Sequence, residues 1–274
     1  MADERDIAAY YDRGDEQGRL GDWGRLEFLR TRELLSRVLP APPATVLDVG
    51  GGAGAYALPL AAEGYEVHLV DPIALHVEQA RAASAAQPDA PLASAEQADA
   101  RELPFADESA DVVLMLGPLY HLTEAADRAR ALHEARRALR PGGLLAAAAI
   151  TRFASTLDGV AQGFLLEPGF EEIVERDLAE GQHRNPDAHP GWFTTAYFHR
   201  PDELEREVAA AGFDVRAVLA IEGAVGAAAE THALDAWLDD PVRRDVLLRA
   251  IRRVEAEPSL LGASPHVLAV ATAP

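Results

Sequence analysis

The stretch TVLDVGGGAGAYALPLAAEGYEVHLVD, residues 45–71, decides the fold of this chain. It starts with mainly apolar and β-branched residues, continues through three glycines and then becomes rich in alanine and leucine. This order predicts a strand over residues 45–49, a tight turn, a helix to about residue 63 and a second strand ending at Asp71. Glycines permit positive φ and let a ligand lie against the main chain. The stretch therefore predicts the first half of a nucleotide-binding α/β unit.

Two aspartates indicate which ligand this turn holds. Asp71 ends the second strand, where its carboxylate can accept hydrogen bonds from both hydroxyls of a ribose. The spacing Gly50-x-Gly52-x-x-Ala55 also satisfies the relaxed dinucleotide pattern. Asp48 argues against a dinucleotide, because its carboxylate precedes the glycines and would repel a pyrophosphate. A ligand with a cationic amino group and a sulfonium suits this position better.

Composition narrows the range of partners. The 274 residues carry a net charge of −20, and no arginine run exceeds two residues, so electrostatics opposes binding to nucleic acid or an anionic membrane. We expect the arginines of residues 243–253 to form a solvated helix face. The chain has no cysteine, which excludes thiolate chemistry, and no lysine, which excludes Schiff bases.

No leader and no apolar span of roughly 18 residues is evident in the sequence. These features predict a cytoplasmic protein that acts on a small molecule, with no nucleic-acid or membrane partner. They leave the oligomeric state open.

The later strands are predicted from apolar runs. A weak strand from about Leu92 leads to Asp99 and Ala100, and the run over residues 112–116 predicts a central parallel strand. Ligands of parallel sheets lie at the carboxyl ends of the strands, so Asp99 could accept a hydrogen bond from an adenine amine; a turn or cap residue is the alternative. Further strands are expected over residues 144–150, 213–221 and 266–272.

Four segments along the chain resemble the class I S-adenosylmethionine-dependent methyltransferases. The pattern Asp48-x-Gly50-x-Gly52-x-Gly54 resembles their first motif, and residues 103–111, LPFADESAD, resemble a segment that commonly follows the third strand. LGPLYHL at 116–122 and LRPGG at 139–143 are similar to a small-molecule subgroup. The resemblance implies a Rossmann-like seven-stranded sheet, mostly parallel with an antiparallel last strand, with helices on both faces. It also implies S-adenosyl-L-methionine as the cofactor.

The resemblance further implies a single methyltransferase domain over residues 1–274. Its parts are an N-terminal cap and helix (1–40), a cofactor-binding core (44–150), a substrate lid (151–199) and the rest of the core (200–274) with a helical insertion at 223–262. For residues 1–25 a loose tail is the alternative to a cap, which the paired Tyr10 and Tyr11 favour.

Cofactor contacts are expected from the glycine turn, the strand ends and the cap: Asp48, Gly50, Gly51, Gly52, Gly54, Asp71, Pro72, Asp99, Ala100, Leu116, Gly117 and Tyr11. Substrate contacts are expected from Tyr120 and from two lid aromatics, Trp192 and Tyr197. Anchoring of the lid to the body is the alternative role of each lid aromatic.

Methyl transfer to a hydroxyl needs one proton acceptor. His121 is the first candidate, because it follows the fourth strand and histidine titrates near neutral pH; His199 is the second. A histidine that caps the next helix is the alternative for His121. His183, Asp187, His189 and His199 match no compact ligand spacing, so no metal site is expected. Two other functions stay open: an NAD(P)-dependent oxidoreductase and a catalytically silent cofactor-binding module.

Overall fold

The computed structural model describes residues 2–11, 24–230 and 234–274, and its centre is one seven-stranded sheet. The strand order is β3-β2-β1-β4-β5-β9-β8, and β9 runs antiparallel to both of its neighbours. The strands are β1 (Thr45–Val49), β2 (Glu66–Asp71), β3 (Ser94–Gln97), β4 (Ala110–Met115), β5 (Leu139–Ile150), β8 (Asp214–Ala220) and β9 (His266–Thr272). The predicted Rossmann-like, mostly parallel sheet is confirmed.

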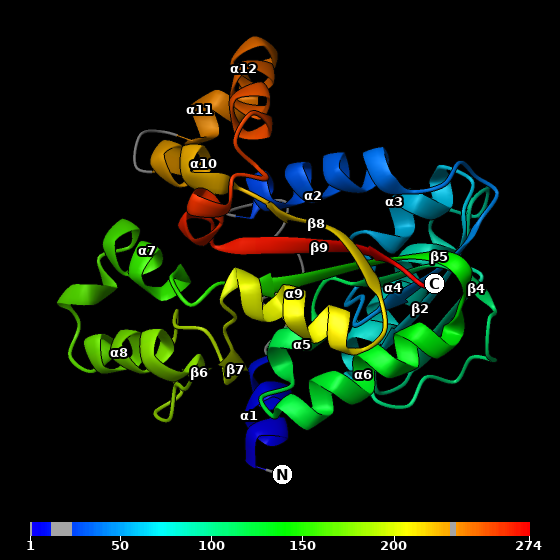
Figure 1. The fold of residues 1–274 in the computed structure, drawn as a ribbon, viewed down its shortest axis with the longest axis horizontal. Coiled ribbons are helices and arrows are strands. Elements are labelled where there is room, and N and C mark those ends of the chain that lie inside the picture. Colours follow the sequence, from blue (N-terminus) through cyan, green and yellow to red (C-terminus); the bar gives the residue numbers. More distant parts are fainter. Residues whose placement is uncertain (1, 12–23, 231–233) are drawn as a thin grey trace.

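Helices cover both faces of this sheet (Figure 1). One face packs on α2 (Arg25–Val38), α3 (Ala57–Ala62) and α4 (Ala74–Ala85), and the other packs on α6 (Ala125–Ala138) and α9 (Pro201–Ala210). Successive residues of a strand point to opposite faces, so Val112 and Leu114 join the first cluster while Val113 and Met115 join the second. Burial on both faces explains the uninterrupted apolar run of β4.

Two predicted strands differ in length from the observed ones. β5 begins at Leu139 rather than at residue 144, but its register with β4 jumps between Ala110 and Val112, and continuous pairing starts at Leu144. The RPGG sequence fills this irregularity, with Gly142 at φ 79°. β3 covers only Ser94–Gln97 because it is an edge strand that pairs with β2 alone.

Two additions lie at the carboxyl edge of the sheet. The first is α1 (Ala2–Tyr11), and the second is the 151–199 segment. This segment contains α7 (Ala154–Ala161), the short helix η2 (Phe164–Leu166), α8 (Phe170–Glu180) and the paired strands β6 (Gln182–His183) and β7 (Ala196–Tyr197). Of the expected N-terminal cap, residues 12–23 lie outside the described residues.

The C-terminal part adds α10 (Gly223–Glu230), α11 (Leu234–Asp239), α12 (Pro241–Arg252) and the short helix η3 (Pro258–Ala263) between β8 and β9. These elements lie beyond α2, at the upper left of Figure 1. Across the described part of the chain, every helix is too short or too polar to cross a membrane.

Candidate functional site

A cavity of about 1190 Å³ lies at the ends of β1, β2 and β4. Many of its lining residues are the ones expected from the sequence: Tyr11, Asp48, Gly50, Gly51, Gly52, Asp71, Pro72, Asp99, Ala100, Leu116, Gly117, Tyr120 and His121. The fold thus gathers side chains from α1, the glycine turn and four strand ends around one space.

The glycine turn is shaped by backbone angles and by close neighbours. Gly50 and Gly52 have φ of 70° and 56°, which disfavour a side chain. At Gly51 an added Cβ would lie 2.7 Å from Asp48 Oδ2. Gly54, with φ 91°, does not line the cavity, and a Cβ there would lie 3.2 Å from Leu58. The structure therefore places Gly54 in the turn but away from the expected cofactor contact.

Asp48 is a buried carboxyl group at the base of the cavity. Its side chain is 1% exposed, and its Oδ2 atom has no hydrogen-bond partner among the described residues. Burial raises the pKa of Asp48 to about 7; the Asp71 charge adds to this rise and a backbone hydrogen bond from Ala57 opposes it. The site therefore contains a carboxyl group that a nearby cation would ionise.

Asp71 links β2 to the glycine turn. Its Oδ2 accepts a hydrogen bond from the Gly52 N–H at 2.9 Å, and its Oδ1 accepts one from the Ile73 N–H at 2.9 Å. Its Oδ1 also lies 3.1 Å from His76 Nδ1. Each carboxylate oxygen has two lone pairs, so these bonds fix the carboxylate and still leave acceptor capacity toward the cavity.

Asp99 lines the cavity while paired to its neighbour Arg101. Its Oδ1 accepts hydrogen bonds from the Arg101 N–H at 2.8 Å and from Nε at 2.9 Å. Burial raises the pKa of Asp99, but the hydrogen bonds and charge of Arg101 outweigh burial and lower it below its ordinary value. Asp99 is therefore an ionised acceptor with a fixed orientation.

His121 meets Tyr11 at the opposite wall. The Tyr11 hydroxyl lies 2.6 Å from His121 Nε2, and Nδ1 is buried without a hydrogen-bond partner in the described part of the chain. Desolvation lowers the pKa of His121 to about 4. The imidazole is therefore neutral near pH 7 and can accept a proton.

The 151–199 segment reaches this wall through Phe193. Its ring centroid lies 5.8 Å from that of His121 and 6.2 Å from that of Tyr120. Phe193 could not be preferred over its aromatic neighbours from sequence, because the short segment around it has no clear period.

Three expected site residues of this segment do not line the cavity. Trp192 packs inside the segment, with ring centroids 5.1 Å from Phe170 and 4.1 Å from His189. The Tyr197 ring lies 3.7 Å from the Arg128 guanidinium carbon. His199 is fully buried with Nε2 3.3 Å from Glu207 Oε2, and burial lowers its pKa. Tyr197 and His199 thus contact the body of the protein, as the anchoring alternative expects, whereas Trp192 packs within the segment itself.

Other cavity residues were not expected. His76 lies in the first turn of α4, shortly after Asp71. This closeness in sequence to the aspartate that we expected to bind ribose could have indicated that His76 lines the cavity. Arg244 also lines the cavity, so the interpretation of residues 243–253 as a wholly solvated face is wrong for this side chain. Its position depends on how α12 packs beside α2, which local sequence does not specify.

The sequence similarity to known proteins is clearest over residues 47–147. Residues 47–147 match the profile of the methyltransferase domain family. An uncharacterized methyltransferase of Mycobacterium tuberculosis is 38% identical over 113 residues, which are 41% of this chain and 42% of that protein. The ubiquinone biosynthesis O-methyltransferase of Azorhizobium caulinodans is 33% identical over 170 residues, covering 62% of this chain and 58% of that protein. The chain thus spans about half the length of these curated relatives.

The similarity of fold extends further than the similarity of sequence. A solved structure from Thermotoga maritima, described as an S-adenosylmethionine-dependent methyltransferase and possible histamine N-methyltransferase, superposes with a TM-score of 0.59. It covers 97% of both chains at 21% identity. The cap, the 151–199 segment and the C-terminal helices thus lie within the part of the chain that this superposition covers.

Proposed function

We propose that this chain, a class I S-adenosylmethionine-dependent methyltransferase, transfers the methyl group of S-adenosyl-L-methionine to a small molecule. The single observation that supports this cofactor most directly is Asp48, whose buried Oδ2 lacks a partner and whose pKa is raised to about 7. A cationic amino group or sulfonium would satisfy and ionise this carboxyl group. A pyrophosphate would instead bring negative charge to it, which disfavours a dinucleotide.

We assign the rest of the cofactor site to the residues around Asp48. Asp71 would accept hydrogen bonds from the ribose hydroxyls, because the Gly52 and Ile73 N–H groups already orient its carboxylate. Asp99 would accept from the adenine amine, and Pro72, Ala100, Leu116 and Gly117 would supply apolar and backbone contacts. This division places adenine toward β3 and the methionine end toward β4 and His121.

The bound cofactor supplies an already activated methyl group, so the protein has to align the nucleophile and accept its proton. We assign the acceptor to His121, which is neutral near pH 7 and lines the cavity. Tyr11 holds His121 Nε2 in the structure, and a substrate hydroxyl that took the place of the tyrosine hydroxyl would meet the same nitrogen. Phe193 and Tyr120 would form the apolar wall beside it.

The small size of the substrate is also our proposal. The cavity holds about 1190 Å³, near the upper end of ordinary ligand pockets, and it has to contain the cofactor as well. The net charge of −20 disfavours nucleic acid. One relative carries a name that specifies O-methylation, which favours a hydroxyl nucleophile over other acceptors.

Incubation with S-adenosyl-L-methionine and a panel of small phenols, alcohols and amines tests this function. We expect S-adenosylhomocysteine to accumulate in equal amount to a product in which a methyl group replaces one hydrogen, and both should form much more slowly with Asp71→Asn at a subsaturating cofactor concentration. A wild-type protein that binds the cofactor and methylates macromolecules but no panel member would contradict the small-molecule assignment.

A further inference from the structure

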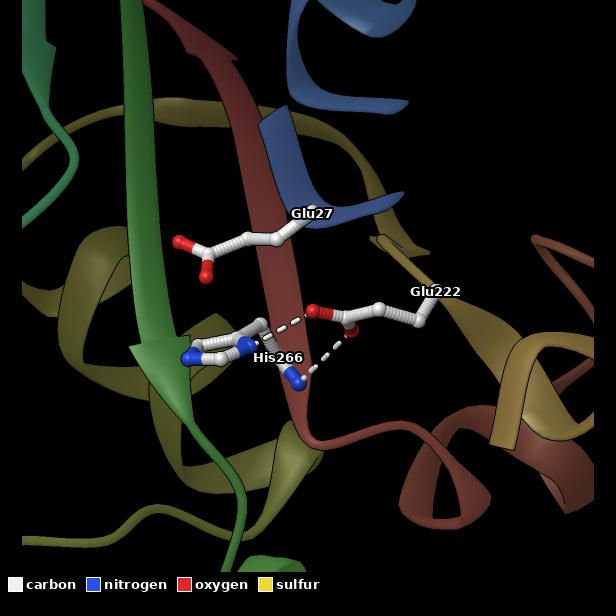
Figure 2. A group of neighbouring side chains, drawn as sticks. All are labelled: Glu27, Glu222 and His266. Carbon is white, nitrogen blue, oxygen red and sulfur yellow. Dashed lines mark hydrogen bonds and ion pairs between the residues drawn. The ribbon is translucent and has the colours of Figure 1, made fainter. Parts of the chain in front are cut away.

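Three side chains with metal-binding atoms converge at the carboxyl edge of β5. Glu27 comes from α2, Glu222 follows β8, and His266 begins β9, where it pairs with the last residue of β5 (Figure 2). One ligand atom from each lies within 4.8 Å of the others. In the described part of the chain they are the one group of three or more His, Asp or Glu residues that meets this distance.

The Glu222 and His266 side chains are held in place by hydrogen bonds. His266 Nδ1 lies 2.7 Å from Glu222 Oε1, and Glu222 Oε2 accepts from the Ser264 hydroxyl at 2.9 Å and from the His266 N–H at 3.1 Å. Glu222 is 3% exposed. The carboxylate therefore has a fixed orientation before any ligand arrives.

Among the described residues, no arginine forms an ion pair with Glu222, whose ionic contact is to His266. Elsewhere on the body, Glu255 pairs with Arg30 and Arg37, and Glu207 pairs with Arg128. Within the described residues, the Glu222 carboxylate forms its hydrogen bonds with Ser264 and His266. Buried carboxylates are generally paired with a charge or bound to metal.

We propose that Glu27, Glu222 and His266 bind one divalent transition-metal ion. Two carboxylates and an imidazole suit ions such as Mn²⁺ and Zn²⁺, for which oxygen and nitrogen ligands lie at about 2.0–2.2 Å. Ligands that share such an ion are about 3 to 4.4 Å apart, so small side-chain rotations within the 4.8 Å cluster suffice.

This site adjoins the cavity through Glu27, which lines it. Asp158 on α7 faces the same region, since Glu222 and His266 both influence the pKa of its carboxyl group, which burial raises. An ion held here would lie between the cofactor cavity and the 151–199 segment. The inference does not depend on the proposed methyl transfer, because binding of the ion can be measured without cofactor or substrate.

Titration of chelator-treated full-length protein with Mn²⁺, followed by the electron paramagnetic resonance signal of the free ion, tests the site. At physiological ionic strength we expect one site per chain in the wild type. Glu27→Gln and His266→Ala should each weaken binding by roughly 10- to 100-fold. Calorimetry with Zn²⁺ should give the same order of affinities.

A double variant, Glu66→Gln with His68→Gln, is the matched control, because these residues form a His–Glu pair on β2 far from the cluster. It should bind Mn²⁺ as the wild type does. Circular dichroism checks that each variant is folded. If a change at Glu222 or His266 prevents folding, Glu27→Gln alone still tests the site. Absence of a one-to-one site in the wild type, or equal affinity in Glu27→Gln and the control, would overturn the proposal.

Discussion

The hydroxyl of Tyr11 lies 2.6 Å from Nε2 of His121, and this contact joins the N-terminal helix to the end of β4 across the mouth of the cavity. The Tyr11 ring also packs edge-on against His76, with centroids 5.2 Å apart. His76 in turn lies 3.1 Å from the Asp71 carboxylate. Two polar contacts and one contact between aromatic rings therefore connect Asp71, the proposed acceptor for the ribose, to His121, the proposed base.

His121→Ala should lower kcat by roughly 100-fold or more while the affinity for S-adenosylhomocysteine stays nearly unchanged. Because desolvation lowers the pKa of His121 to about 4, the wild-type kcat/KM for the small-molecule substrate at saturating cofactor should stay level through the ordinary histidine range and fall only near pH 4. This differs from the fall near neutral pH that an unperturbed histidine would give. His133→Ala, an exposed histidine on α6, is the control. A loss of less than threefold in kcat where chemistry limits would give His121 a structural role.

His121 should also make the fold sensitive to acid. The unfolded chain takes up a proton on this histidine below its ordinary pKa of 6.5, whereas the folded chain does so only below about 4. Stability should therefore fall as pH drops through this window, by about 3 kcal/mol when complete. Urea unfolding of His121→Gln should show a smaller acid loss than the wild type, whereas His133→Gln should not differ. Parallel losses in all three proteins would show that His121 is not desolvated.

Asp48 should link cofactor binding to proton release. Below its raised pKa of about 7, the Asp48 carboxyl group is protonated, and a cationic ligand has to displace this proton in order to bind. The affinity for S-adenosylhomocysteine should therefore rise as the pH approaches 7 and stay level above it. The expected slope is up to about tenfold per pH unit. Calorimetry in buffers of different ionisation enthalpy measures the released proton directly. Asp48→Asn should bind without this dependence, and an identical pH profile in wild type and variant would remove Asp48 from the cofactor site.

Phe193 and Trp192 provide a matched pair in the 151–199 segment. Phe193→Ala should lower kcat/KM for the small-molecule substrate by roughly tenfold or more, because it removes an apolar wall beside His121, while cofactor affinity stays the same. Trp192→Ala should instead destabilise the segment by about 3 to 5 kcal/mol, since its ring packs within it. Limited proteolysis measures the second effect. If Trp192→Ala lowered kcat/KM while Phe193→Ala destabilised the segment, Trp192 would be the substrate contact, as predicted from sequence.

The sequence predicted well which residues around the glycine turn line the cavity, because local rules decide their positions. A strand, a glycine turn and Asp71 lie within one short stretch, and parallel strands necessarily bring Asp48, Asp99 and His121 to the same edge. The backbone angles of Gly50 and Gly52 were likewise implied by their residue type. Each of these inferences used at most one strand and the turn after it.

The other half depends on packing between segments that are distant in the sequence. The pattern of aromatic residues in the 151–199 segment gave no indication that Phe193 contacts Tyr120 and His121 while Trp192 packs within the segment. Glu27, Glu222 and His266 come from three separate elements, so no ligand spacing exists for a sequence motif to detect. Arg244 reaches the cavity for the same reason, through the packing of α12.

Titration calorimetry with S-adenosylhomocysteine, NAD⁺ and NADP⁺ tests the central claim most directly. We predict that S-adenosylhomocysteine binds once per chain, that the two dinucleotides do not, and that Asp71→Asn weakens binding by about 1.5 to 3 kcal/mol. Asp89→Asn, at an exposed position before β3, should bind as the wild type does. Tight binding of a dinucleotide without binding of S-adenosylhomocysteine, or equal affinities of wild type and Asp71→Asn, would contradict the account.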